Sequence, residues 1–189
     1  MKDVRLTVAI NRPAQEVFDF TLNPENTPKW IDGIVKEQTD ESPTKLGTVY
    51  KNQGSDGNWN EYEITAYEPG IMFIMSKKDG NYHVKYTLKP LDDNQCELEY
   101  YEWVDDGDLD EPFTQDILEK LKDVIEKPKR YLITLKSGKE HLTDYFDNDE
   151  AVLRWVNTGA AGIVYRNAHI RLLPDDIASI QPVGEENET

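Results

Sequence analysis

The fold is decided by residues 4–18, which read VRLTVAINRPAQEVF. Apolar residues occupy every second position of the first seven, which predicts a strand whose buried face holds Val4, Leu6, Val8 and Ile10. From Asn11 the hydrophobic period becomes helical, with Pro13 suited to the first turn and Asn11 suited to cap it. The stretch therefore predicts a half-buried strand that leads directly into a helix.

The chain that follows alternates short apolar runs with turn residues. A second short helix is predicted from Asn23, and it contains Trp30. Five or six further strands follow, at residues 36–39, 46–53, 58–67, 71–76, 82–89 and 96–103. Strands of this length and spacing, separated by Gly, Pro, Asn and Asp, indicate a meandering antiparallel sheet.

Alternation within these strands predicts which side chains face inward. Glutamates and lysines at alternate positions should face water, so the residues between them should face the interior. This predicts an inner face with Tyr50, Tyr62, Ile64, Ala66, Tyr82, Val84, Tyr86, Leu88, Leu98 and Tyr100. By the same alternation His83 should lie on the outer face. Trp103 should also lie there unless a bulge shifts the strand.

A long helix is predicted at residues 112–127, where apolar side chains recur at helical spacing. Its stripe contains Phe113, Ile117, Leu121, Val124 and Ile125. Asp110 is suited to cap the helix, and Pro128 would end it. The stripe needs an apolar partner, and the concave face of the sheet is the obvious one.

Four stretches in order resemble motifs of one superfamily: VAINRPAQEVF at 8–18, NPENTPKW at 23–30, LGT at 46–48 and ITAYEPG at 64–70. Together they resemble the START-like helix-grip (SRPBCC) superfamily, in particular its polyketide cyclase/dehydrase-like branch, over roughly residues 3–127. The resemblance implies an α+β fold in which a curved antiparallel sheet wraps around the long C-terminal helix. These motifs specify a fold rather than a chemistry.

The resemblance also implies a cavity between sheet and helix that holds a hydrophobic or amphipathic small molecule. The predicted lining consists of Tyr50, Tyr62, Ile64, Tyr82, Val84, Tyr86, Leu98, Tyr100, Phe113, Ile117 and Leu121. Tyrosine suits such a wall, because it offers an apolar body and a hydroxyl that needs a partner. The alternative is a filled core in which the hydroxyls reach the rim.

Composition excludes several classes of protein. Of the 189 residues, 21 are Lys or Arg and 37 are Asp or Glu, so the net charge is -16. Such a surface disfavours binding to nucleic acid and stable association with anionic membranes. The single cysteine, Cys96, excludes a disulfide framework and a Cys-rich zinc site. With no apolar leader or membrane-length segment, we expect a cytoplasmic protein; its oligomeric state is open.

The residues contain no catalytic constellation, and we predict no metal and no cofactor. His83, His141 and His169 are interpreted as surface histidines, and Cys96 as a buried, inert thiol. Six carboxylates fall between Glu102 and Glu111, where the EF-hand spacing fails. We interpret them as a solvated loop before a helix N-terminus, with a weak divalent-cation site as the alternative.

The remaining chain is predicted to form a second unit at residues 129–182, after a first domain at 1–128. Strands at 131–135, 163–165, 169–173 and 177–180, with a helix after Asp147 or Asn148, indicate a β-β-α-β-β order. Residues 183–189 are expected to be an acidic, disordered tail. The unit could cover the cavity, mediate assembly or only stabilise the first domain.

Three functions remain open from the sequence. The first is binding or carriage of a hydrophobic small molecule. The second is a cyclase or dehydrase acting on a polyketide-like or aromatic substrate, with Tyr62, Tyr86 and Tyr100 as possible proton donors. The third is a protein-interaction or regulatory module that meets a basic partner through the acidic surface.

Overall fold

The computed structural model describes residues 2–127, 130–143, 152, 163–164, 171–172 and 174–183. The chain divides into two compact units, Met1–Glu126 and Lys127–Thr189. The division lies near Pro128, where we expected the boundary between domains. The helix predicted after Asp147 or Asn148, His169 and the acidic tail from residue 184 onward lie outside the described residues.

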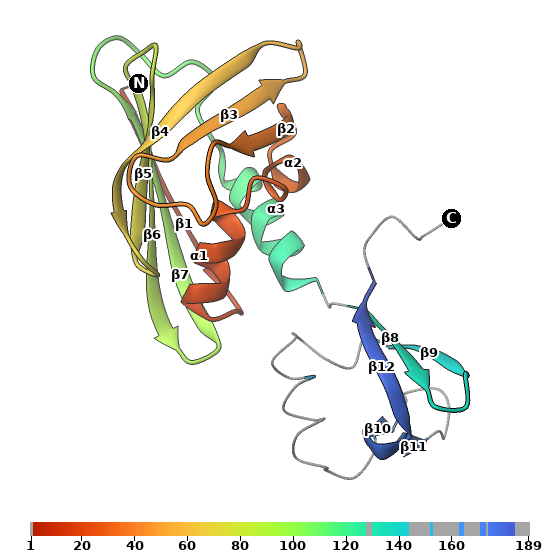
Figure 1. Ribbon diagram of the computed structural model, residues 1–189. Coiled ribbons are helices and arrows are strands. Elements are labelled where there is room, and N and C mark those ends of the chain that lie inside the picture. The colour runs from red at the N-terminus through yellow and green to blue at the C-terminus, as the bar shows by residue number, and fades with distance from the viewer. Residues whose placement is uncertain are drawn as a thin grey trace. The chain divides into compact units, whose positions relative to one another are not determined.

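The first unit is built on one seven-stranded antiparallel sheet with the strand order β1-β7-β6-β5-β4-β3-β2. The strands are β1 (Asp3–Ile10), β2 (Ile34–Thr39), β3 (Val49–Gly54), β4 (Trp59–Glu68), β5 (Met72–Lys77), β6 (Tyr82–Asp92) and β7 (Gln95–Val104). From β2 to β7 each strand pairs with the next along the chain, and β1 pairs with β7. The predicted meander is therefore confirmed, and Figure 1 shows that the sheet is strongly curled.

Three helices lie on the concave side of this sheet (Figure 1). They are α1 (Ala14–Leu22), α2 (Thr27–Trp30) and α3 (Gln115–Glu126). Helix α3 contacts β1 at one edge of the sheet, α2 contacts β2 at the other edge, and α2 also contacts α3. The helices thus close the gap between the two edges, as the helix-grip prediction requires.

A ladder of aromatic rings crosses the inside of this unit, in the order Phe18, Phe73, Tyr86, Tyr100, Phe113 and Trp30. Neighbouring ring centroids are 5.7, 4.6, 5.2, 4.6 and 6.2 Å apart. The contacts are edge-to-face or stacked, and each such pair stabilises a fold by about 0.5–1.5 kcal/mol beyond area burial. The ladder joins α1 to the sheet and the sheet to α2.

The start of α3 differs from the prediction. The helix begins at Gln115 rather than Pro112, so Asp110 does not cap it and Phe113 precedes it. Two features delay the helix: Glu111 has a φ of 52°, and the backbone N–H of Phe113 donates to Glu102 at 2.7 Å. A residue with positive φ cannot belong to a right-handed helix.

The cap assigned to Asn11 is also wrong, because Pro13 precedes the first residue of α1. The backbone N–H of Asn11 donates instead to a carboxylate oxygen of Glu126 at 2.6 Å. The guanidinium of Arg12 donates to the carbonyl of Glu126 at 3.1 Å. A cation at a helix C-terminus is favourable, so this turn after β1 secures the end of α3.

The inner-face parity is confirmed for most strands but fails in β4. The pairing of β4 with β5 shifts register between Ile64 and Ala66. Tyr67 therefore packs against Phe18, with ring centroids 5.7 Å apart, while Thr65 is exposed. A bulge reverses the alternation beyond it, so Tyr67 takes the inward place that we predicted for Ala66.

The outer-face predictions for β6 and β7 are confirmed. The β6–β7 pairing runs without a shift from Tyr82 to Pro90. The ring of Trp103 stacks on both His83 and Tyr101, with centroids 5.0 Å away in each case. His83 also shares a 2.7 Å hydrogen bond with the Ser76 hydroxyl, so its role is to pack on the outer face.

The second unit contains a three-stranded sheet with the order β12-β8-β9. Its strands are β8 (Tyr131–Leu135), β9 (Glu140–Thr143) and β12 (Ile177–Pro182), and a two-stranded sheet joins β10 (Ile163–Val164) to β11 (Arg171–Leu172). The strands predicted at 131–135 and 177–180 are therefore confirmed. A short 3-10 helix, Pro174–Asp176, precedes β12.

We expect Tyr50→Phe to lower the free energy of unfolding by about 1–3 kcal/mol, because a buried hydrogen bond is lost. The Tyr50 hydroxyl donates to the carbonyl of Leu22, the last residue of α1, at 2.6 Å. Urea denaturation measures the effect. The matched control is Tyr67→Phe, which also removes one hydroxyl from the sheet interior and should change stability less. Equal losses in both variants would contradict this role of Tyr50.

Candidate functional site

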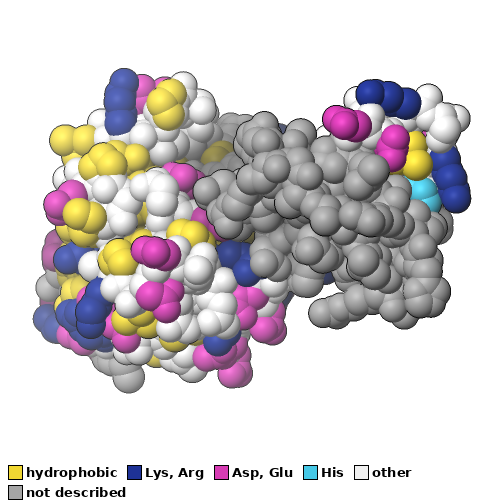
Figure 2. All heavy atoms as spheres, turned by 90° about the horizontal axis from the view of Figure 1, so that it is seen from below, with side chains coloured by type: hydrophobic (Ala, Val, Ile, Leu, Met, Phe, Trp, Pro, Cys, Tyr) yellow, Lys and Arg dark blue, Asp and Glu magenta, His cyan; other side chains and the backbone are white. Residues whose placement is uncertain are grey.

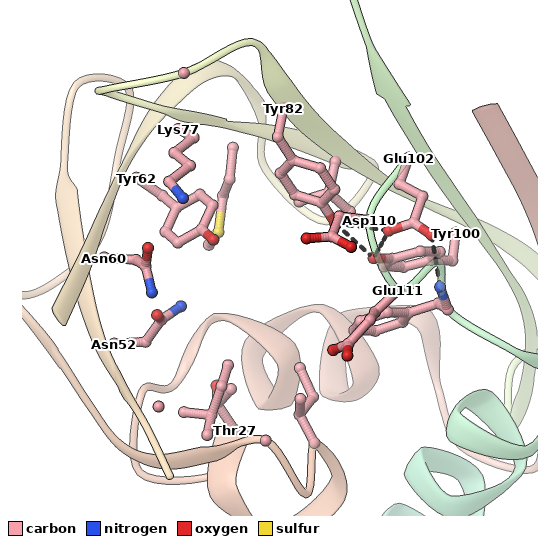
Figure 3. A pocket seen from close by; sticks show the side chains of 18 of the residues that line it. Thr27, Asn52, Asn60, Tyr62, Lys77, Tyr82, Tyr100, Glu102, Asp110 and Glu111 are labelled. Carbon is pink, nitrogen blue, oxygen red and sulfur yellow. Dashed lines mark hydrogen bonds between the residues drawn. The ribbon is translucent and has the colours of Figure 1, made fainter. Parts of the chain in front are cut away.

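A cavity of about 580 Å³ lies between the concave face of the sheet and the segments around α2 and α3. This volume falls within the range typical of small-molecule sites. Its wall combines aromatic side chains with polar ones from β2, β3, β4, β5, β6 and β7 and from the loop that follows β7. Figure 3 shows the hollow and labels ten of the side chains that line it.

Six of the eleven residues predicted to line the cavity do so: Tyr62, Tyr82, Val84, Tyr86, Tyr100 and Phe113. The other five, Tyr50, Ile64, Leu98, Ile117 and Leu121, belong to the packed core instead. Alternation identifies the inner face of a strand, but it does not reveal which part of that face a helix covers. Here α1 packs against β6 and β7, so only part of the inner face remains open.

The most buried polar group of the wall is the carboxylate of Glu102 on β7, which is 1% exposed. One of its oxygens, Oε2, accepts hydrogen bonds from the hydroxyls of Tyr82 at 2.7 Å and Tyr100 at 2.9 Å. The other, Oε1, accepts from the N–H of Phe113. Figure 3 shows this cluster at one side of the hollow. Glu102 is therefore not part of a solvated loop, because β7 continues through it to Val104.

Three tyrosines of the wall keep their protons at neutral pH. Burial, together with the negative charge of Glu102, raises the pKa of Tyr82, of Tyr86 and of Tyr100 above its usual value. Their hydroxyls are therefore hydrogen-bond donors. Tyr82 and Tyr100 already donate to Glu102. The Tyr86 hydroxyl, by contrast, has no hydrogen-bond partner among the described residues.

A second carboxylate, Glu37 on β2, was missed by the sequence analysis. The pairing of β2 with β3 shifts between Ile34 and Lys36, and beyond this irregularity Glu37 faces the cavity. Its Oε2 accepts a 2.5 Å hydrogen bond from the Thr27 hydroxyl. Burial raises the pKa of Glu37 to about 7, although hydrogen bonds from Thr27 and Asn52 oppose the shift. Near neutral pH this group can both take up and release a proton.

The rest of the polar wall lies in two groups (Figure 3). Asn52, Asn60 and Lys77 come from the central strands, and Asp110 and Glu111 come from the loop after β7. The two groups lie on different sides of the hollow, with Tyr62 beside the first group and Tyr82 beside the second. A ligand in the cavity would therefore meet amides, an ammonium and the carboxylate of Glu37 on one side, and the carboxylates of the loop after β7 on the other.

Within the part of the chain that the structure describes, no group of three or more His, Cys, Asp or Glu side chains could hold a metal ion. The cation site considered for residues 102–111 is not formed, since Glu102 turns inward. Cys96 is fully buried, and burial raises its pKa to about 11, as expected for an unreactive thiol.

The length and apolar character of the described helices decide whether any of them could span a membrane. None of them is both long enough and apolar enough to cross a bilayer.

Glu37 predicts a measurable dependence of stability on pH. Its pKa is about 7 in the folded chain, against an ordinary value of 4.5, so between these values the folded state binds more protons. The free energy of unfolding should therefore fall as pH rises through this window, by up to roughly 3 kcal/mol. Glu37→Gln should remove this loss. The stability of the variant relative to the wild type should therefore increase between about pH 5 and about pH 8.

Urea denaturation at both pH values checks this expectation. The control is Glu68→Gln, which removes a carboxylate from the exposed end of β4. A stability difference between wild type and Glu37→Gln that stays constant with pH would refute the buried, proton-binding role of Glu37.

The comparisons with known proteins agree with this architecture. No curated protein matches the chain. Solved structures do: a START superfamily protein from Mycobacterium smegmatis is 14% identical with a TM-score of 0.51, the match covering 67% of this chain and 95% of that one. Protein XoxI from Bacillus cereus is 16% identical with a TM-score of 0.52, over 66% and 95% of the two chains. Protein MLL2253 from Mesorhizobium loti is 17% identical with a TM-score of 0.52, over 67% and 98%.

At these identities the similarity establishes the fold, which is START-like. The family described as "Polyketide cyclase / dehydrase and lipid transport" matches residues 1–127, which is the whole first unit. The curled sheet, the long helix and the cavity on the concave side of the sheet fit that assignment. The chain therefore belongs to the polyketide cyclase/dehydrase and lipid transport family of the START-like (SRPBCC) superfamily.

Proposed function

We propose that the first unit binds an amphipathic small molecule inside its cavity. The observation that supports this most is the cavity itself, whose volume of about 580 Å³ suits one small ligand. Its wall offers the partly exposed rings of Tyr62 and Tyr82 as apolar surface. Polar groups such as Asn60 and Glu102 would orient the bound molecule.

The family description supports the same proposal. It names polyketide cyclases, dehydrases and lipid transport, and START-like proteins bind small hydrophobic ligands. Burial of apolar surface is the general driving force for taking such a molecule out of water. Binding or carriage needs no further chemistry, whereas catalysis needs groups that exchange protons with the substrate.

Glu37 is the observation that favours an enzyme of the cyclase or dehydrase type as a second candidate. Its pKa of about 7 suits a general base that removes a proton from a bound substrate near neutral pH. Of the three tyrosines considered as proton donors, Tyr100 already donates to Glu102, which leaves Tyr62 and Tyr86. A molecule recovered with the protein would decide between binding and catalysis, because a binding protein leaves the molecule unchanged and an enzyme converts it.

The binding proposal predicts that filling the cavity abolishes ligand uptake. Asn60→Trp places an indole on the cavity wall. Nile red, a neutral dye that fluoresces in apolar surroundings, should bind the wild type and lose about tenfold or more in affinity for the variant. Native mass spectrometry of the protein from its own host should detect a bound small molecule on the wild type alone.

The matched control is Gln38→Trp, which adds the same indole at an exposed position of β2. It should bind Nile red as the wild type does. If Asn60→Trp folds, as circular dichroism would show, and also keeps full Nile red affinity, the dye binds elsewhere and the proposal fails.

A further inference from the structure

The ionisable side chains around the cavity are almost all acidic. Its lining includes the carboxylates of Glu37, Asp79, Glu102, Asp108, Asp110 and Glu111. Lys77 is the one Lys or Arg among the described lining residues. On the face of the first unit drawn in Figure 2, acidic and basic side chains are intermingled. Six carboxylates against one lysine is also a larger acidic excess than that of the whole chain, which has 37 Asp and Glu against 21 Lys and Arg.

The buried carboxylate of Glu102 is satisfied by neutral donors alone. Its three hydrogen bonds come from Tyr82, Tyr100 and the backbone of Phe113. A carboxylate offers about four lone-pair sites, so one acceptor site remains open. Burying a charge without a counter-charge is costly, and a ligand cation beside Glu102 would lower that cost.

Tyr86 is a second, independent indication of a ligand. It is 7% exposed and lines the cavity, and its hydroxyl has no hydrogen-bond partner among the described residues. The charges of Glu37 and Glu102 both act on this hydroxyl, so it lies within electrostatic range of both carboxylates. Its oxygen can accept a hydrogen bond from an N–H group, and its ring can attract a cation.

We infer that the cavity selects amphipathic cations, which are molecules with an apolar body and a protonated amine. This inference rests on the proposed binding function and names its ligand class. The apolar body would lie on the partly exposed rings of Tyr62 and Tyr82, and the ammonium would lie near the Tyr86 hydroxyl, between Glu102 and the carboxylates of the loop after β7. A fatty acid or another anionic lipid is disfavoured, because the carboxylates of the wall would repel its head group and Lys77 is the one Lys or Arg among the described lining residues that would attract it.

The test compares three probes with the same ten-carbon chain: decylamine, decanol and decanoate. Each is titrated against the full chain carrying Nile red, at neutral pH and physiological ionic strength, so that weak surface attraction is screened. Decylamine should displace the dye with about tenfold higher affinity than decanol, and decanol should bind more tightly than decanoate. Decanoate or decanol binding as tightly as decylamine would overturn the inference while leaving the binding function in place.

Variants of the carboxylates locate the effect. Glu102→Gln should weaken decylamine binding about tenfold more than it weakens decanol binding. Glu111→Gly should act in the same direction; because Glu111 has a φ of 52°, glycine relieves strain there and the variant should fold even if Glu102→Gln does not. The control Glu68→Gln makes the same change of net charge on the surface and should bind decylamine as the wild type does.

Two outcomes separate the inference from the function beneath it. If Asn60→Trp, which leaves the net charge unchanged, still binds decylamine with wild-type affinity, the amine adsorbs to the acidic surface and the inference is wrong. If neither Nile red nor any of the three probes binds the wild type, the cavity takes no amphipathic ligand, and the proposed function fails together with the inference.

Discussion

The interior of the first unit depends on the carboxylate of Glu102 and its three hydrogen bonds. They join β6 through Tyr82, β7 through Tyr100 and the segment before α3 through Phe113. A buried carboxylate must be satisfied, so these three elements are held at fixed positions around it. Phe113 is thereby placed to stack on Tyr100 at 4.6 Å. The same contact delays the start of α3, which frees residues 105–114 to form the loop beside the cavity.

The aromatic ladder then divides the inner face of the sheet into two regions. On one side α1 and α3 pack on the sheet, and Leu98 of β7 and Leu121 of α3 are both fully buried there. On the other side the wall turns polar, with Glu37, Asn60 and Lys77 among its residues. Polar side chains cannot be buried without partners, so this region cannot close into an apolar core. A cavity is the consequence. The polar residues that prevent an apolar core from forming are the same residues that would contact a ligand.

The polar lining of the cavity connects the fold to the proposed binding function. The START-like framework supplies the hollow, and many different activities share such a framework. In this chain carboxylates outnumber basic groups around the aromatic rings, with a single lysine among the described lining residues. Glu37 adds a proton-binding group that changes its charge near neutral pH. The proposed preference for amphipathic cations and the alternative of proton-transfer chemistry both follow from these carboxylates.

The sequence by itself determined the elements and their order, because periodicity and turn residues are local. It predicted the strand of residues 4–10, the meander and the long helix, and it placed Tyr82, Tyr86 and Tyr100 inward. Only the tertiary structure decided where the alternation breaks, in β2 and β4, because a bulge depends on pairing with another strand. It also decided that Glu102 is buried and that Tyr50 belongs to the core. A carboxylate in an acidic stretch of sequence is predicted to face water. Its burial here depends on hydrogen bonds from residues distant in the sequence, which the local pattern does not contain.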